Sequence, residues 1–83
     1  MRFHFQVRTE SHVLLTEAAE LRTTVEARQE AARRVGQLLQ EHADKLWADQ
    51  EWQMNVTDDT GLILFAITVH ALKSAATSEY RVR

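Results

Sequence analysis

The sequence predicts an α+β domain in which an antiparallel three- or four-stranded sheet packs against one long amphipathic helix. Three observations support this prediction. Polar and apolar residues alternate over residues 2–8, apolar residues recur every three or four positions after Thr24, and two alternating runs flank residues 58–61. A period of two indicates half-buried strands, whereas spacings of three and four indicate a helix with one buried face. The expected order is β-β-α-β-β, with the second strand short or absent.

The first strand is predicted over residues 2–8, where Phe3, Phe5 and Val7 share one face. The other face then has Arg2, His4, Gln6 and Arg8. Residues 9–11 turn the chain, and residues 12–15 are long enough only for a short, ragged second strand. Residues 16–22 fit either a loop or a helical turn.

A single helix is predicted from Thr24 to about Trp47. Thr23 followed three residues later by Glu26 fits a capping box, in which each side chain accepts a hydrogen bond from a free backbone donor. Such a helix would be about 36 Å long, whereas strands of seven or eight residues span about 25 Å. One end of the helix should therefore overhang the sheet, and we expect it to be the end with Leu46 and Trp47.

The last two strands are predicted to form a hairpin, because Asp58-Asp59-Thr60-Gly61 suits a turn. With a four-residue loop, Thr57 pairs with Leu62, and the same register pairs Val56 with Ile63, Met54 with Phe65 and Trp52 with Ile67. The large apolar residues from Trp52 to Val69 then share the core face. Residues 72–76 could continue as a short helical turn.

Composition and length indicate one small domain. The chain has 83 residues, of which 45% are hydrophobic and 27% charged, as is typical of a globular protein. We assign residues 1–76 to the domain and expect residues 77–83 to fray. The absence of cysteine excludes disulfides and thiolate metal sites. No signal peptide or stretch of roughly 20 apolar residues is present, so we expect a cytoplasmic protein with no membrane partner.

Several segments together resemble a known family. The first strand begins Arg-Phe-His-Phe, and Leu21 precedes a helix that contains Glu26-Ala27-Arg28-Gln29-Glu30-Ala31-Ala32. A tryptophan near the helix end is followed by Val56-Thr57-Asp58-Asp59-Thr60-Gly61 and Leu62-Ile63-Leu64-Phe65. Over roughly residues 3–70 the chain resembles a family of short uncharacterised proteins from rhizobia-type bacteria, domain of unknown function 6894. The resemblance implies the β-β-α-β-β layout and brings no established activity, cofactor or catalytic residue. The chain departs from the family at Thr16-Glu17-Ala18-Ala19-Glu20, where members usually have an Asp-x-Glu-Gly type turn.

Few side chains form a pattern that indicates chemistry. His4, His70 and Glu51 fall on the polar sheet face and would make a two-histidine, one-carboxylate metal site if their strands were neighbours. No two histidines have a metal-ligand spacing on one element, so solvent-facing histidines are the better interpretation, and His42 fits a boundary position on the helix. Turn formation accounts for Asp58 and Asp59. No catalytic triad order or phosphate-binding loop is present, and we expect no enzymatic activity, metal or cofactor.

The outer face of the hairpin gives the main functional indication. Leu62, Leu64 and Ala66 form an apolar strip on a face that should be polar, and such strips often mark interfaces. The strip could instead be covered by the tail through Leu72 and Ala75. We favour a homodimer that also uses Trp47, and hence a non-catalytic interaction or regulatory module that binds a second copy or another protein.

Two other functions compete with this prediction. An antitoxin-like, nucleic-acid-associated module would use the strand face with Arg2, His4 and Arg8. The net charge of −2, spread evenly along the chain, disfavours it, because binding to nucleic acid depends on neutralising phosphates. A metal-dependent enzyme is the third and weakest alternative.

Overall fold

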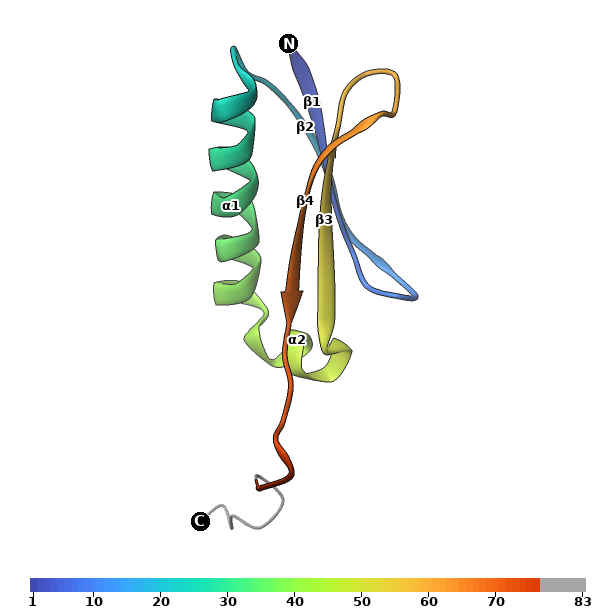
Figure 1. Cartoon of the computed structure of the whole chain (residues 1–83), viewed down its shortest axis with the longest axis vertical. Coiled ribbons are helices and arrows are strands. Elements are labelled where there is room, and N and C mark those ends of the chain that lie inside the picture. Colours follow the sequence, from blue (N-terminus) through green and yellow to red (C-terminus); the bar gives the residue numbers. More distant parts are fainter. Residues whose placement is uncertain (77–83) are drawn as a thin grey trace.

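The computed structural model describes residues 1–76, which fold into a four-stranded antiparallel sheet with helical segments packed on one of its faces (Figure 1). The elements follow one another as β1 (Arg2–Arg8), β2 (Val13–Glu20), α1 (Thr24–Glu41), α2 (Ala43–Asp49), β3 (Glu51–Thr57) and β4 (Ile63–His70). In space the strands are ordered β2-β1-β3-β4, so β1 and β3 are central and β2 and β4 are the edges. The predicted α+β class is confirmed, but the single helix is wrong, because two helices separate the two strand pairs.

The core lies between the two central strands and α1. Fully buried side chains alternate along β1 and β3, as predicted: Phe3, Phe5, Val7, Trp52, Met54 and Val56. They meet the small buried residues Ala27, Ala31 and Val35 of α1. Small helix residues let α1 lie close to a sheet face built of large ones. Burying each large side chain contributes about 1.5–3 kcal/mol, so this layer supplies most of the stability of the domain.

The second strand is longer than predicted. β2 pairs with β1 from Arg2 opposite Glu20 to Arg8 opposite Val13, with a register shift beside Val7. Residues 16–20 are rich in alanine and glutamate, which have low strand propensity, and this composition made the prediction of a short or absent strand wrong. Pairing with β1 holds these residues extended regardless of their intrinsic preference.

The predicted long helix breaks at His42, whose backbone angles (φ −132°, ψ 43°) are not helical. The 18 residues of α1 span about 27 Å, which matches the roughly 25 Å length of the strands. The expected overhang is therefore absent, because residues 43–49 form α2 at the end of the sheet (Figure 1). At the other end of α1, the Thr23 hydroxyl accepts a hydrogen bond from the Glu26 amide (3.1 Å), which confirms this half of the predicted capping box.

The hairpin has a different register from the predicted one. The Gly61 amide bonds the Asp58 carbonyl and the Asp58 amide bonds the Leu62 carbonyl (both 3.1 Å), with Gly61 at φ +88°. The loop therefore has three residues and not four, which moves the register by one. A bulge in β4 moves it by one more, so Val56 lies opposite Phe65 instead of Ile63. The two shifts together move the register by two residues, and a shift of two leaves alternate residues on the same face of the sheet. Trp52, Met54 and Val56 therefore still face the core.

The chain beyond β4 continues away from the hairpin loop (Figure 1). The Ala71 amide donates to the Gln50 carbonyl at 2.8 Å, and Leu72 is 72% exposed. Of the predicted helical turn at residues 72–76, only residues 75 and 76 adopt helical geometry, in a 3-10 turn. Up to residue 76 the tail does not cover Leu62, which is itself 62% exposed. The predicted fraying of residues 77–83 concerns a part of the chain outside the described residues.

Candidate interaction surface

The structure separates the four residues predicted to form an interface. Leu62 is exposed between the hairpin loop and β4, and Ala66 is exposed on the open face of the sheet, opposite Asn55. Leu64 packs against the core because it lies at the bulge, so the predicted strip of Leu62, Leu64 and Ala66 is not one surface. Trp47 is 51% exposed on α2, at the opposite end of the sheet from the loop (Figure 1).

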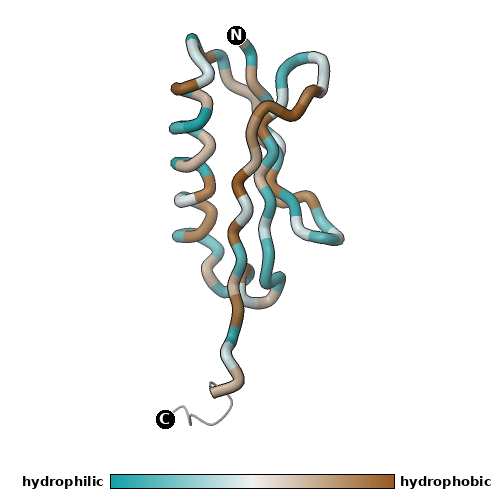
Figure 2. Tube along the Cα trace, in the orientation of Figure 1, coloured by the Kyte–Doolittle hydropathy of each residue, from teal (hydrophilic) through white to brown (hydrophobic). Residues whose placement is uncertain are grey.

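The edge strand β4 pairs with β3 on one side and has no strand on its outer side within residues 1–76. Its residues Ile63–Val69 are all uncharged, and Figure 2 shows hydrophobic residues clustered where the chain enters the strand. The Ala71 amide points toward β3, since it bonds the Gln50 carbonyl. Backbone groups alternate in direction along a strand, so those of Ala66, Thr68 and His70 point to the free edge. This edge is thus an uncharged row of available donors and acceptors.

An apolar surface runs beside this edge, between β4 and α1. Phe65, Ile67 and Val69 are only half-buried, although they lie on the helix-facing side of β4. The guanidinium of Arg28 lies 5.9 Å from the centre of the Phe65 ring, which shows which face of α1 turns toward β4. Residues three and four apart share that face. We define the α1/β4 seam as the apolar residues Val25, Ala32, Leu39, Phe65, Ile67 and Val69, and the charged side chain of Arg28 lies among them.

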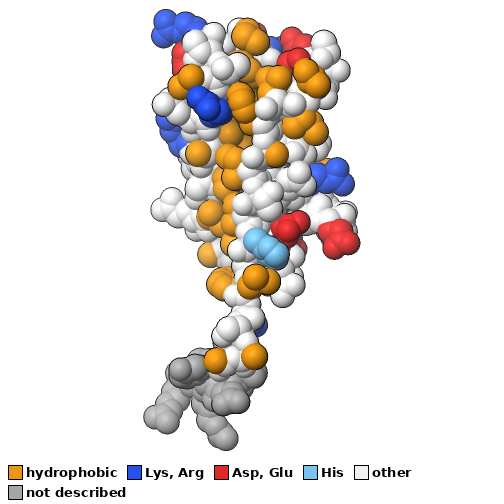
Figure 3. All heavy atoms as spheres, viewed as in Figure 1, with side chains coloured by type: hydrophobic (Ala, Val, Ile, Leu, Met, Phe, Trp, Pro, Cys, Tyr) orange, Lys and Arg blue, Asp and Glu red, His pale blue; other side chains and the backbone are white. Residues whose placement is uncertain are grey.

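The seam extends along most of the domain. Figure 3 shows hydrophobic side chains following α1 and β4 down the face that carries both elements. Val25 is 48% exposed, and Ala32 and Gly36 are also exposed on the same side of the helix. A Cβ atom at Gly36 would meet nothing within 4 Å, so no side chain of α1 covers the seam at this point. An apolar surface of this length on one face is typical of a binding surface.

At the opposite edge of the sheet, β2 likewise has no strand on its outer side within residues 1–76, but charged side chains link it to α1. Arg34 of α1 reaches Glu17 of β2 (Nη1 to Oε2, 2.7 Å) and Glu30 of its own helix (Nε to Oε2, 3.0 Å), and Arg33 also bonds Glu30. The Arg34 guanidinium lies 4.6 Å from the centre of the Phe5 ring. Burial opposes ionisation of Glu30, but the hydrogen bonds from Arg34 and Arg33 outweigh it and lower the pKa of this carboxyl.

The face of the sheet that α1 does not cover is polar and its charges are balanced. Arg2, His4 and Arg8 share this face, as predicted, because they alternate with the buried residues of β1. His4 Nε2 lies 2.7 Å from the Asp59 carboxylate, and Arg2 lies opposite Glu20 in the strand register. The three basic residues therefore do not form an isolated positive patch.

The histidine and glutamate residues considered as metal ligands are not brought together. His70 Nδ1 lies 3.9 Å from Glu51 Oε1, but β3 separates the strands that contain His4 and His70. His4 lies beside Thr57, at the other end of β3 from Glu51. No group of three potential ligands that could hold a metal ion occurs in the described part of the chain. His42 lies at the break between the helices.

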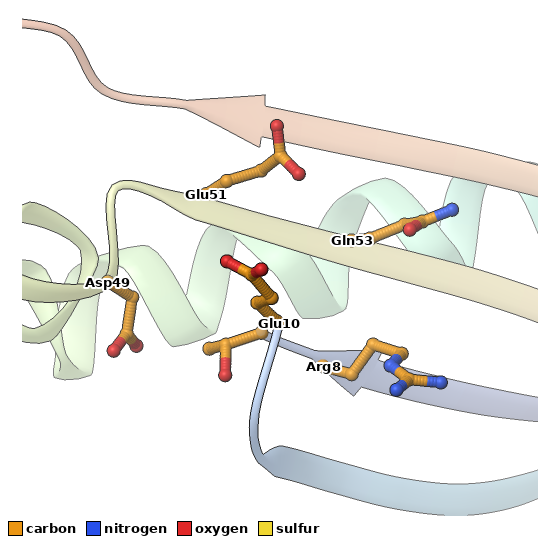
Figure 4. A pocket seen from close by; sticks show the side chains of 6 residues that line it. Arg8, Glu10, Asp49, Glu51 and Gln53 are labelled. Carbon is orange, nitrogen blue, oxygen red and sulfur yellow. The ribbon is translucent and has the colours of Figure 1, made fainter.

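A shallow polar hollow of about 330 Å³ lies at the end of the sheet, beside the β1–β2 turn. Its lining residues are Arg8, Thr9, Glu10, Asp49, Glu51 and Gln53 (Figure 4). Asp49 accepts a hydrogen bond from Trp52 Nε1 (3.0 Å), which anchors α2 to β3. Glu51 points toward β4, and Asp49 points away from it (Figure 4). These two carboxylates therefore serve structural contacts rather than converging on a common point.

The fold and its surfaces define a small α+β domain with one charged and one uncharged sheet edge. The chain belongs to the family described as domain of unknown function 6894, which matches residues 2–70. The matched range contains all six helices and strands, so the whole described fold is that of the family domain. No curated protein and no solved structure matches the chain. Within residues 1–76, no helix is both long and apolar enough to cross a bilayer.

Sequence reasoning missed the α1/β4 seam. It assigned Phe65 and Ile67 wholly to the core because alternation indicates which face a residue occupies, not how well that face is covered. One available signal was the absence of charge over Ile63–Val69, which is unusual for an edge strand. The other was the run of small residues, Ala32 and Gly36, on one side of an otherwise charged helix.

Proposed function

We propose that this protein is a non-catalytic interaction or regulatory module that acts as a homodimer, with the α1/β4 seam as its contact surface. The observation that supports this proposal is an uncharged edge strand, unpaired on its outer side, whose Phe65, Ile67 and Val69 are only partly buried. Natural proteins usually protect sheet edges with charges, prolines or covering elements. An edge without such protection favours association with another chain.

The small core of the domain adds a reason for association. A chain of this size buries only roughly 60% of its unfolded surface, so a single copy has little stability in reserve. Binding a second copy that interacts only with the folded state would add stability by mass action. A standard interface covers about 800 Å² per partner, which is a small part of the 6260 Å² surface of the chain.

Sedimentation equilibrium on the 83-residue chain tests the proposal, and we expect a dimer at micromolar concentration. Ala32→Glu adds a carboxylate to the exposed helix wall of the seam and should weaken the dimer by at least about tenfold, equivalent to about 1.4 kcal/mol. The charge has to be desolvated or placed near its symmetry mate when two seams meet. Both effects oppose association without disturbing the buried face of α1.

Gln37→Glu is the matched control, since Gln37 is exposed on the same helix but lines a hollow on the β2 side with Glu17 and Arg34. This variant should leave the dimer affinity unchanged. Urea unfolding of both variants checks that the monomer fold is intact. A strictly monomeric wild-type chain, or equal loss of affinity in both variants, would argue against a dimer formed through the seam.

The antitoxin-like, nucleic-acid-associated role is the alternative proposal. It would use Arg2, His4 and Arg8, which share the open sheet face, but Asp59 and Glu20 reduce the positive charge there. Fluorescence anisotropy with a labelled duplex at low salt would detect such binding. Salt-sensitive binding that weakens in the Arg2→Ala/Arg8→Ala variant would favour this role over the one proposed above.

A further inference from the structure

We propose that two copies of this chain join by antiparallel pairing of their β4 edges, with the two-fold axis at Ile67, to make one continuous eight-stranded sheet. This inference rests on the proposed homodimer and specifies its geometry. In the pair, Ala66 lies opposite the partner's Thr68, and Phe65 lies opposite the partner's Val69. The seams of the two copies become one apolar surface on the helix-bearing face.

The backbone of β4 is suited to this pairing. The N–H and C=O groups of Ala66, Thr68 and His70 point to the free edge, because the neighbouring positions bond β3. Antiparallel pairing of a strand with its own copy is two-fold symmetric, so the same surface serves both partners and the assembly closes at two subunits. An axis at Ile67 pairs the straight part of β4, between the bulge and His70, along its whole length.

The side chains of β4 are compatible with a second copy at the edge. No charge occurs from Ile63 to Val69, so pairing the strand with itself creates no like-charge contact along this segment. On the helix side, Ile67 meets the partner's Ile67 between two pairs formed by Phe65 and Val69. These three residues are half-buried in the single chain, and a second set continues the same layer.

The two ends of β4 also complement each other. Leu62 precedes the strand and is 62% exposed, and Leu72 follows it and is 72% exposed. Within one chain they lie at opposite ends of the sheet. Antiparallel pairing about Ile67 brings the hairpin end of each copy beside the partner's residues after β4, so the exposed leucines of the two ends are brought close together. This self-complementarity favours a second copy over an unrelated strand.

The other edge of the sheet also lacks an outer strand within residues 1–76, but it is charged. β2 contains Glu17 and Glu20, and Glu17 is bonded to Arg34. Pairing β2 with its own copy would place carboxylates near one another and disturb the contact with α1. The contrast between the edges therefore assigns the pairing to β4.

Disulfide trapping tests the register, and the chain contains no cysteine of its own. Ala66→Cys and Thr68→Cys alter exposed residues on the open face of β4. Residues directly opposite in such a pair have Cα atoms about 5.5 Å apart, within the range of a disulfide, whereas the diagonal pair of two Ala66 positions lies about 7–8 Å apart. An equimolar mixture of ¹⁵N-labelled Ala66→Cys and unlabelled Thr68→Cys chains, oxidised in a glutathione buffer, should yield mainly the mixed disulfide dimer by mass spectrometry.

A matched control uses the other edge strand. Ala18 and Thr16 are likewise exposed on the open face of β2 and are two residues apart, so a mixture of Ala18→Cys and Thr16→Cys chains should give about tenfold less mixed dimer. A wild-type dimer in sedimentation with dominant self-linked Ala66→Cys, with linkage at β2, or with no linkage would overturn the β4 pairing and leave the homodimer standing. A strictly monomeric chain would overturn both and leave the edge free for a strand of another protein.

Discussion

The two edge strands of this domain lie on the same sheet and differ in almost every property that controls association. β2 contains two carboxylates, and Arg34 ties one of them to α1 while covering the ring of Phe5. β4 has no charge over seven residues. Its Phe65, Ile67 and Val69 are only partly buried, and the part of α1 next to them has small side chains. The difference is the basis of the proposed division of roles, in which the β2 edge maintains the fold of the single chain and the β4 edge binds a partner.

Removing Arg34 should have the largest effect and should act on the fold. The side chain is only 16% exposed, and Arg34→Ala removes its charged hydrogen bonds to Glu17 and Glu30 together with its contact to Phe5. We expect the free energy of unfolding to fall by about 2–3 kcal/mol in urea titrations. Arg33→Ala is the control, because Arg33 also bonds Glu30 but is 65% exposed. It should change the stability by less than about 1 kcal/mol. Equal losses in the two variants would mean that β2 is not secured by Arg34.

A charge placed on each edge strand in turn should distinguish the roles of β2 and β4 more clearly. Thr68 of β4 and Thr16 of β2 are both exposed on the open face, so Thr68→Lys and Thr16→Lys make the same chemical change at the two edges. A lysine on an edge strand opposes pairing, because two copies bring like charges together. Thr68→Lys should raise the dimer dissociation constant by at least about tenfold in sedimentation equilibrium, and Thr16→Lys should leave it unchanged. The reverse pattern would place the contact at β2.

The sequence predicted the central part of the molecule better than its edges. Alternation in residues 2–8 and from Trp52 to Val56 identified the buried face of β1 and β3, because a half-buried strand imposes a period of two on its residues. The capping hydrogen bond of Thr23 was equally local and equally predictable. In each case the residues that determine the structure are close together in the sequence.

The incorrect predictions concern features that depend on distant contacts. β2 is extended because β1 pairs with it, and nothing in Glu17-Ala18-Ala19-Glu20 indicates a strand. The break at His42 limits α1 to the length of the sheet, although no glycine or proline marks the position. In the hairpin, the short loop and the bulge each moved the register by one residue, so the predicted faces of Trp52, Met54 and Val56 survived an incorrect pairing. Two residues changed faces: Leu64 packs against the core, and Ile63, which was predicted to face Val56 in the core, is 57% exposed. The predicted strip was thereby lost as a single surface.

The pH dependence of stability gives the smallest expected effect and shows whether the β2 side is held by ionised groups. The pKa of Glu30 is lowered because the hydrogen bonds from Arg34 and Arg33 outweigh the opposing effect of burial. A carboxyl with a lowered pKa in the folded state contributes stability that is complete above its unfolded pKa of about 4.3 and is lost as the pH falls through the folded value. Glu30→Gln should therefore cost up to about 1 kcal/mol at pH 7, and this difference from the wild type should shrink as the pH falls toward about 3.

The contribution of Asp58 to the pH dependence of stability must be separated from that of Glu30. The pKa of the Asp58 carboxyl is also lowered, by hydrogen bonds from the Thr60 side chain and from the backbone of the turn. Asp58 is the same in both chains, so the difference between the wild type and Glu30→Gln removes its contribution. A difference that stays constant from pH 7 to about pH 3 would mean that Glu30 acts through packing rather than through its charge. The β2 edge would then differ from the β4 edge in its packing and not in a dependence on ionised groups. A difference that disappears in acid would show that the β2 side depends on ionised carboxylates, which Ile63–Val69 of β4 lack.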